Sequence, residues 1–355
     1  MLSGKRKIHY SNLLFFCCIL IASASQPEQD TLNFPKSLVH STNLPILIIN
    51  CPTATVDFMV NDNAVRFAID TGICKLTNAA DITNAWKHFL NTNDVLGIKV
   101  FSKPGPVCGT RVGLVTALVS SIIASGILPN TNIIIWDHNR EDLTNAGFLN
   151  LEKKWGIQVL DVLQTGYDTN VFYENPIVGN LNWGDVEFGL SPENTSRKSH
   201  VTRILSQKVT RLFLITPLVY HPRFGICGHL YHLGLQSVDN TQRFIRDQDT
   251  FAIAIPEICA MEQIGDKLAL CITDALLCQY EGGPTGQPHY VVPLNQIWIG
   301  TDPIAMDLLG LQQIQKVRQK MGLPLIKRSL QLWENAFLLQ LGTLNTNNLI
   351  TVWLP

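Results

Sequence analysis

This sequence predicts an α/β fold in which helices flank a mostly parallel sheet. Two observations favour that class. Short runs of apolar and β-branched residues recur along the chain, and amphipathic stretches of helical length separate them. Short apolar runs are typical of strands buried on both faces, and strands that alternate with helices build βαβ units. We therefore expect one large domain or two closely packed lobes.

The predicted elements follow one another from residue 46 onward. The runs with the character of buried strands are residues 46–49, 95–100, 133–136, 157–160, 212–215, 268–272 and 297–299. Helical periodicity occupies residues 64–76, 81–90, 112–125 and 303–321. These elements place the domain at residues 45–345. Residues 167–199 are rich in Asn, Gly, Pro and Ser, which predicts an irregular excursion.

The N-terminal segment has the layout of a signal peptide. Three basic residues at 5–7 precede an apolar run at 13–22, and small residues at 22–24 offer a cleavage site. The apolar run is short of the about 20 residues that span a bilayer, so cleavage is expected and a retained membrane anchor is the alternative. We expect residues 1–24 to be the signal peptide, residues 25–44 a linker, and the protein to be exported, to the periplasm or outside the cell.

Charge and composition exclude several classes of partner and cofactor. Cleavage after residue 24 removes three of the 27 Lys and Arg residues and none of the 28 Asp and Glu residues, which leaves an acidic chain. A nucleic-acid partner is therefore not expected, because phosphate binding needs a concentrated basic face. The sequence also contains no Walker loop, no G-x-G-x-x-G between a strand and a helix, and no pair of cysteines two apart. These absences argue against a P-loop nucleotide, a Rossmann dinucleotide and an iron–sulfur cluster.

Candidate site residues stand where predicted strands end. In a parallel sheet, ligands bind beyond the carboxyl ends of the strands. Lys99 ends the strand at 95–100, and it could hold an anion or pair with a carboxylate on the surface. Asp137 follows the strand at 133–136 together with His138 and Arg140. It could act as a base, a metal ligand or a ribose contact, or simply cap the next helix.

Two later strands are followed by further candidates. Asp274 comes after the strand at 268–272, and Gly282 and Gly283 open a loop whose backbone could approach a ligand closely or only turn the chain. Asp302 precedes Pro303, which is the chemistry of a helix N-terminus and explains this carboxylate. Asp307 lies one turn further on, where capping does not explain it, so we favour it as a functional residue.

The densest group of potential metal ligands lies between residues 221 and 232. His229 and His232 are three residues apart and could share one helix face, with His221 or Cys227 completing a transition-metal site. The spacing fits no standard zinc pattern, and the alternative is a polar loop that runs into a helix. The cofactor is therefore open, with a divalent metal as one candidate.

Several of these segments together resemble the bacterial domain-of-unknown-function family 362. The similarity covers about residues 50–320, and its most specific parts are Asp94–Lys99 and the helix start at 301–307. The other matching segments are the helix that runs to Gly126 and residues 132–137, 225–244 and 266–274. The resemblance implies an α/β domain whose biochemical role is largely unassigned. Some members look like iron–sulfur proteins with an added ferredoxin-type segment, which this chain lacks.

The chain also departs from the family pattern. Members usually carry a lysine at the position of Val219 and a Lys-Asn pair at the positions of Tyr231 and His232. If those lysines bind an anion in relatives, this chain has lost part of that site or binds another ligand.

Two hypotheses follow for the function. The first is an exported protein with a small-molecule site built from Lys99, Asp137, His221, Asp274 and Asp307, in which lysine holds an anion and the carboxylates act as bases or ligands. The second is a binding or structural protein on the same scaffold with a degenerate site. Fold alone does not choose between them.

Overall fold

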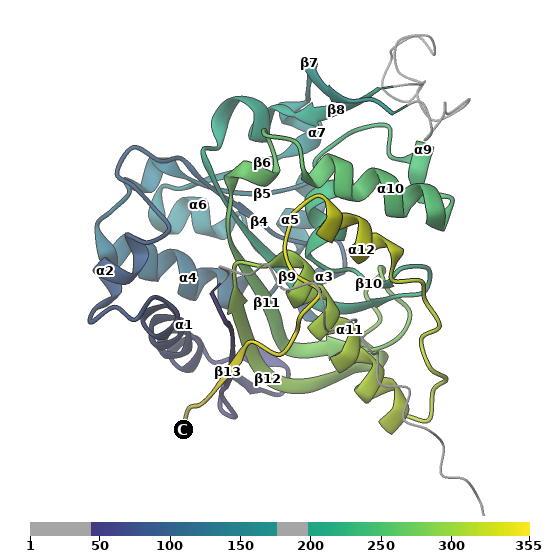
Figure 1. Ribbon diagram of the computed structural model, residues 1–355. Coiled ribbons are helices and arrows are strands. Elements are labelled where there is room, and N and C mark those ends of the chain that lie inside the picture. The colour runs from purple at the N-terminus through teal and green to yellow at the C-terminus, as the bar shows by residue number, and fades with distance from the viewer. Residues whose placement is uncertain (1–43, 176–197) are drawn as a thin grey trace, which may run out of the picture. The chain divides into compact units, whose positions relative to one another are not determined.

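A twisted nine-stranded sheet forms the centre of the part of the chain that the computed structural model describes, residues 44–175 and 198–355 (Figure 1). Its order is β13-β1-β12-β11-β9-β4-β5-β6, with β10 paired to β9. The strands are β1 (Ile46–Asn50), β4 (Leu96–Lys99), β5 (Ile133–Asp137), β6 (Gln158–Asp161), β9 (Arg211–His221), β10 (Gly225–Ile226), β11 (Leu268–Gln279), β12 (Val291–Gly300) and β13 (Leu349–Trp353).

Most neighbouring strands of this sheet run parallel. The pairs β11–β9, β9–β4, β4–β5 and β5–β6 are all parallel, as is β1–β13 at the edge. Only β12 and the short β10 run antiparallel to their neighbours within the described sheet. The predicted fold class is therefore confirmed, and each predicted apolar run coincides with a strand.

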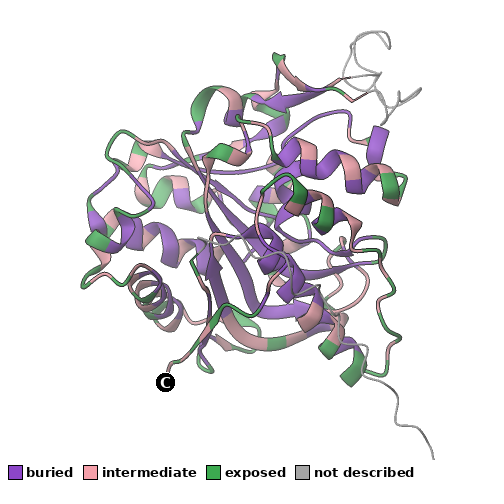
Figure 2. Ribbon diagram, viewed as in Figure 1, coloured by how far each residue is buried: buried purple, intermediate pink, exposed green. Residues whose placement is uncertain are grey.

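Helices cover both faces of the sheet. On one side α1 (Asp62–Thr77) packs against α4 (Val112–Ser125), α2 (Ile82–Trp86) and strands β1 and β12. On the other side α11 (Pro303–Lys320) contacts β9, β10 and β11, and α10 (Gln248–Cys259) packs on α12 (Gln331–Leu338). The central strands β4, β5, β9 and β11 between these layers are almost wholly buried, as Figure 2 shows, whereas β13 and the first half of β12 are partly exposed. This burial explains why the central strands appear in the sequence as unbroken apolar runs.

Short helical turns connect the larger elements around the strand ends. They are α3 (Gly105–Cys108), α5 (Arg140–Asn145), α6 (Asn150–Trp155), α7 (Val162–Thr165), α9 (Gln242–Ile245) and two π-helical turns at Ile204–Lys208 and Tyr231–Leu235. Such turns place several side chains of the candidate site described below.

The start of α11 follows its predicted chemistry. Asp302 is the N-cap, and its Oδ1 accepts hydrogen bonds from the backbone N–H groups of Ile304 and Ala305 at 2.9 Å. Its other oxygen accepts from the N–H of Thr343 at 2.7 Å. Capping of α11 and the link to Thr343 therefore give the Asp302 carboxylate a structural role in the described part of the chain.

The irregular excursion predicted for residues 167–199 begins and ends in regular structure. Strands β7 (Tyr167–Tyr173) and β8 (Ser199–Thr202) pair antiparallel, with Tyr167 opposite Thr202. A two-stranded pair needs few apolar positions, so its sequence lacks a strong periodic pattern. Residues 176–197, together with the predicted signal peptide and all but the last residue of the predicted linker, lie outside the described residues. Strand β13 lies beyond the predicted domain boundary at residue 345.

Candidate functional site

A cleft of about 510 Å³ opens beyond the carboxyl ends of β4 and β5. We call it the strand-end cleft. The loop after β4, the loop after β5 and the segment 235–242 form most of its wall. The wall comprises Phe101, Lys103, Asp137, His138, Asn139, Asp142, Tyr167, Tyr231, Leu235, Gln236, Val238, Asp239, Asn240, Thr241, Gln242, Ile245 and Pro284. Its position is where the topology of a parallel sheet leads us to expect a ligand.

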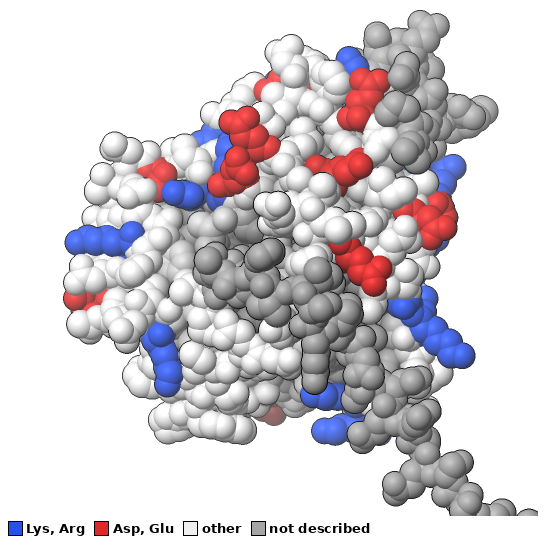
Figure 3. All heavy atoms as spheres, in the orientation of Figure 1, with Lys and Arg blue, Asp and Glu red and all other residues white. Residues whose placement is uncertain are grey.

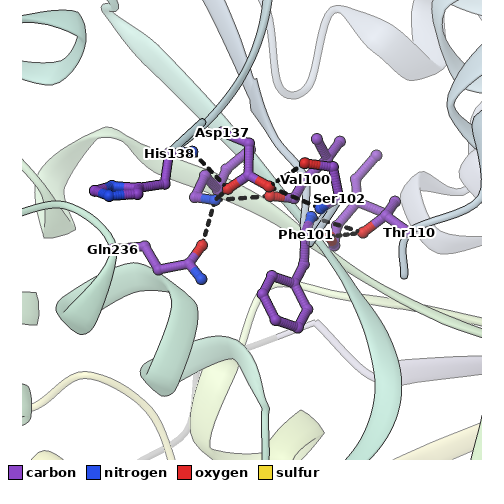
Figure 4. Close-up of polar contacts among 9 residues, drawn as sticks. Val100, Phe101, Ser102, Thr110, Asp137, His138 and Gln236 are labelled. Atoms are coloured by element: carbon purple, nitrogen blue, oxygen red, sulfur yellow. Dashed lines mark hydrogen bonds and ion pairs between the residues drawn. The ribbon is translucent and has the colours of Figure 1, made fainter. Parts of the chain in front are cut away.

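A buried ion pair between Lys99 and Asp137 lies at the base of this cleft (Figure 4). The Lys99 ammonium is 1% exposed and donates to Asp137 Oδ1 and Gln236 Oε1 at 2.5 Å each, and to the carbonyl of Val100 at 2.7 Å. Three acceptors match the three hydrogens of an ammonium group. All three ammonium hydrogens of Lys99 are therefore bonded to acceptors of the protein itself. No hydrogen of this group is left for the anion that the sequence led us to expect.

The Asp137 carboxylate is equally well occupied. Besides Lys99, it accepts from the backbone N–H and hydroxyl of Ser102 at 2.7 and 2.6 Å, and from the N–H of His138 at 2.8 Å. Burial by itself would raise the pKa of Asp137, but Lys99 and Ser102 outweigh burial and hold the pKa below its usual range. Asp137 is thus a fixed anion that ties the loops after β4 and β5 together.

His138 and Asp142 are two titratable groups on this wall whose side chains form no hydrogen bond with another described residue. Figure 4 shows the His138 ring pointing away from the Asp137 carboxylate. Desolvation within the cleft, together with Lys99 and Lys103, lowers the pKa of His138. Desolvation and the neighbouring Asp137 raise the pKa of Asp142. The sequence pattern pointed to the polar cluster at 137–140 and to Asp137 in particular, and the structure shows that His138, the next residue, lines the cleft as well.

The wall contains further residues that sequence analysis did not select as site residues. Asp239 lines the cleft and accepts from both the backbone N–H and Nδ1 of His200, at 2.5 and 3.0 Å. Tyr167, from the start of β7, also lines it, and burial together with the charge of Asp239 raises the pKa of this tyrosine. Tyr167 could have been assigned to the cleft only if residues 167–173 had been predicted as a strand. The weak apolar periodicity of that segment gave no such prediction.

The glycine loop after β11 reaches the rim of the cleft through its next residue. A Cβ on Gly283 would lie 1.9 Å from the carbonyl oxygen of Tyr220, so only glycine fits there. Pro284 then lines the cleft. Gly282 and Gly283 therefore bring the loop to the cleft by close backbone packing, whereas they do not line it themselves.

Asp274 lies away from the cleft and is fully buried. Its carboxylate pairs with the Arg111 guanidinium at 2.8 Å and accepts from the Arg111 backbone N–H at 2.8 Å. Arg111 is the residue at which α4 begins. The predicted ligand role is therefore replaced by a structural one, in which Asp274 fastens the start of α4 to β11.

Asp307 also lies outside the strand-end cleft. It accepts from the backbone N–H groups of His229 and Leu230, from His229 Nδ1 at 3.2 Å and from Trp333 Nε1 at 3.4 Å. These donors belong to the turn after β10 and to α12. The structure therefore places the Asp307 carboxylate among buried donors from other elements and not in the strand-end cleft.

The predicted metal site at His221, His229 and His232 does not form. Within residues 44–175 and 198–355, no three His, Cys, Asp or Glu side chains gather so that they could hold a metal ion. His229 binds Asp307, and His232 packs against Phe101 with 4.4 Å between ring centroids. His221 instead lines a separate open hollow. The pattern misled because residues 231–235 form a π-helical turn, so spacing by three does not align side chains as in an α-helix.

Buried His232 makes the stability of the protein depend on pH. The side chain is 1% exposed, and burial together with the charge of Lys99 lowers its pKa to about 3. The unfolded chain binds this proton near pH 6.5, so the unfolded state holds more protons between about pH 3 and pH 6.5. We expect the free energy of unfolding to fall by about 1.4 kcal/mol per pH unit as pH drops through that range.

Urea unfolding of the wild type and of His232→Phe at several pH values measures this effect. Phenylalanine keeps an aromatic ring beside Phe101 but binds no proton, so the variant is expected to show a clearly shallower loss of stability below pH 6. His88→Ala, at an exposed histidine, serves as the control and should follow the wild type. Equal pH dependence in the wild type and His232→Phe would contradict the assignment.

Comparisons with known proteins supply no family. No protein-family model matches the chain, and a search of curated proteins finds no match. A crystal structure of a Thermotoga maritima protein, a target of a structural genomics consortium, is similar with a TM-score of 0.39 and 14% sequence identity. The similarity covers 76% of this chain and 61% of that one, which is less than two thirds of the other protein's length.

Two surface observations complete the description. On the face drawn in Figure 3, acidic and basic side chains are interspersed with uncharged surface. Among the described helices, none is both long and apolar enough to span a membrane.

Proposed function

We propose that this protein binds a small polar molecule in the strand-end cleft. The observation that carries the proposal is the cleft itself, about 510 Å³ in volume and placed at the carboxyl ends of parallel strands β4 and β5. Ligand pockets for small molecules typically have volumes of about 300–1,000 Å³. The buried Lys99–Asp137 pair beneath it holds the two loops in a fixed geometry, as a binding site requires.

The side chains of the wall define the chemistry of the ligand. The wall carries the amide groups of Asn139, Gln236 and Gln242, and aromatic rings of Phe101, Tyr167 and Tyr231 offer flat apolar surface. This combination suits a molecule with several hydroxyl, amide or amine groups on a small carbon frame.

Charge narrows the choice further. Lys99 is occupied by its own partners, so the anionic ligand expected from the sequence loses its main support. The wall carries Lys103 together with the carboxylates Asp142 and Asp239. Both signs are present, which favours an uncharged or zwitterionic ligand such as a polyol or an amino acid over a simple anion.

Acid–base catalysis on the bound molecule is the second candidate function. It is favoured by one observation, the pair formed by His138 and Asp142 on the cleft wall. The pKa of Asp142 is raised toward the range in which a side chain exchanges protons efficiently, and the lowered pKa of His138 keeps its ring neutral and able to accept a proton. Substitutions of His138 and Asp142 would then weaken both binding and catalysis. An assay for chemical turnover of any ligand that is found would therefore distinguish simple binding from catalysis.

Two expectations from the sequence stand as proposals beside this one. We propose that the protein is exported, on the basis of the basic, apolar and small-residue segments within residues 1–24. We also propose that it is a variant member of family 362, on the basis of Asp94–Lys99 and residues 301–307. Mass spectrometry of the protein recovered from outside the producing cell would reveal whether cleavage occurs near residue 24.

A ligand screen tests the binding proposal. Amino acids, polyols, organic acids and nucleosides are added to the purified protein, and stabilisation against heat is measured. A molecule that binds in the cleft should lose about tenfold in affinity, measured by calorimetry, when His138→Ala or Asp142→Asn removes a contact. His88→Ala and Asp266→Asn are the matched controls at exposed positions off the cleft, and they should bind as the wild type does.

Two outcomes would overturn the proposal. One is a screen in which no member of these classes stabilises the wild type. The other is a ligand whose affinity is the same in His138→Ala, Asp142→Asn and both controls, because such a ligand binds elsewhere.

A further inference from the structure

A second hollow, separate from the strand-end cleft except for the shared residue Ile245, opens beside His221. Its volume is about 540 Å³, and it is lined by His221, Pro222, Arg223, Phe224, Ile245, Gln248 and Arg328. We call it the His221 hollow. Two arginines, a histidine and a glutamine supply its polar surface, and none of the lining residues is a carboxylate.

The His221 ring is held in one tautomer. Its Nδ1 accepts hydrogen bonds from the backbone N–H groups of Arg223 and Phe224, each at 3.1 Å. A nitrogen that accepts carries no hydrogen, so the neutral ring bears its hydrogen on Nε2. The ring itself is fixed between Phe224 and Tyr231, with centroid distances of 4.6 and 5.4 Å. His221 therefore offers an N–H donor from a rigid position, and this donor has no acceptor among the described residues.

The two arginines leave positive charge without a partner. Neither Arg223 nor Arg328 forms an ion pair with any carboxylate in the described ranges. One guanidinium nitrogen of Arg223 binds the carbonyl of Ile245, and one of Arg328 binds the carbonyl of Lys327 at 3.0 Å. The Arg328 Nε is buried and has no hydrogen-bond partner in the same ranges. An unpaired buried donor of a charged group is costly, so an acceptor that reaches it would bind favourably.

Both charges act on the histidine. Burial, and then the charges of Arg223 and Arg328, lower the pKa of His221 to about 4. The charged groups that bear on this ring thus come from the turn after β9 and from the segment after α11. An anion in the hollow would face positive charge from two sides and a fixed N–H from the third.

We propose that the His221 hollow binds an oxyanion, held by the guanidinium groups of Arg223 and Arg328 and by Nε2–H of His221. A phosphate group and a carboxylate share this chemistry. Three separate donor groups suit the tetrahedral phosphate better, because its oxygens point in separate directions, whereas the two oxygens of a carboxylate lie in one plane. This site is independent of the binding function proposed for the strand-end cleft.

Titration of the full chain with inorganic phosphate, at constant ionic strength, tests the inference. Calorimetry gives the affinity, and the ring-proton signals of His221 in NMR spectra give its pKa. We expect saturable binding of phosphate, a rise of the His221 pKa from about 4 toward its ordinary value on binding, and tighter binding as pH falls. Arg223→Gln and Arg328→Gln should each weaken phosphate binding about tenfold.

Lys327→Gln is the matched control, since it removes one exposed positive charge next to Arg328 without touching the hollow. It should change the affinity by less than about twofold, as expected for a screened surface charge. A parallel titration with succinate identifies the natural group, because tighter binding of succinate than of phosphate would assign the site to carboxylates.

The inference is overturned if phosphate and succinate both fail to bind in a saturable manner. It is also overturned if Lys327→Gln weakens binding as much as Arg328→Gln, because the attraction would then be diffuse. None of these variants alters a polar residue of the strand-end cleft, so either failure leaves the proposed function of that cleft intact.

Discussion

Lys99→Met is expected to lower the free energy of unfolding by about 3–5 kcal/mol, the cost of removing one partner of a buried ion pair. The Asp137 carboxylate would stay buried at the base of the strand-end cleft without its counter-charge, and Gln236 would lose its donor. Methionine is similar in length to lysine, so little of the loss should come from an empty volume. Equilibrium unfolding in urea measures the change.

Lys103→Met supplies the control for this experiment. Lys103 follows the same strand but is exposed, so the substitution should change the free energy of unfolding by no more than about 0.5 kcal/mol. If Lys99→Met and Lys103→Met lowered the free energy of unfolding equally, the buried ion pair would contribute no more to stability than an exposed lysine does. Cleft ligands should also bind less well to Lys99→Met than to the wild type, because the loops after β4 and β5 would no longer be tied together by Asp137.

Asp274→Asn is expected to have an effect of the same size, about 3–5 kcal/mol. The side chain is 0% exposed, and its partner Arg111 is buried as well. Asparagine fills nearly the same space and still accepts from the Arg111 backbone N–H, but it leaves the guanidinium charge without compensation. Urea unfolding gives the size of the loss, and hydrogen exchange of amides at the start of α4 should reveal earlier local opening.

A double variant separates charge from packing at this site. Adding Arg111→Met to Asp274→Asn removes the uncompensated charge, so the double variant is expected to be more stable than Asp274→Asn alone. Asp266→Asn, at an exposed position, is the control and should be close to the wild type. If the double variant is less stable than either single variant, packing and not charge dominates the region.

Strand positions could be predicted from the sequence because burial on both faces leaves a simple signal. Strand β5 is buried throughout and appears as a run of apolar residues. Strand direction leaves no such signal. Nothing in the composition of β12 distinguishes an antiparallel strand from the parallel ones around it. Helix α10 was not predicted at all, and Pro256 inside it breaks the usual pattern of a helix.

The site was predictable in part for a geometric reason. Carboxyl ends of neighbouring parallel strands meet, so Lys99 and Asp137 fall together without any knowledge of the intervening chain. The same reasoning selected Asp274 and Asp307, but the structure places both of them outside the strand-end cleft. A carboxylate near a strand end has the same sequence pattern whether it meets a ligand or a buried donor, and the donor to Asp274 comes from Arg111, 163 residues away. Such partners become visible only when the chain is folded.

The pairing of β1 with β13 has a consequence for the order in which the molecule assembles. Ile46 pairs with Leu349, so this edge of β1 is paired only once a segment 303 residues further along the chain has been made. Until then the outer edge of β1 presents unpaired backbone groups, which invite association with other unfinished chains. Pairing of this edge is thus a long-range closure, which forms slowly and leaves the edge open to association in the meantime.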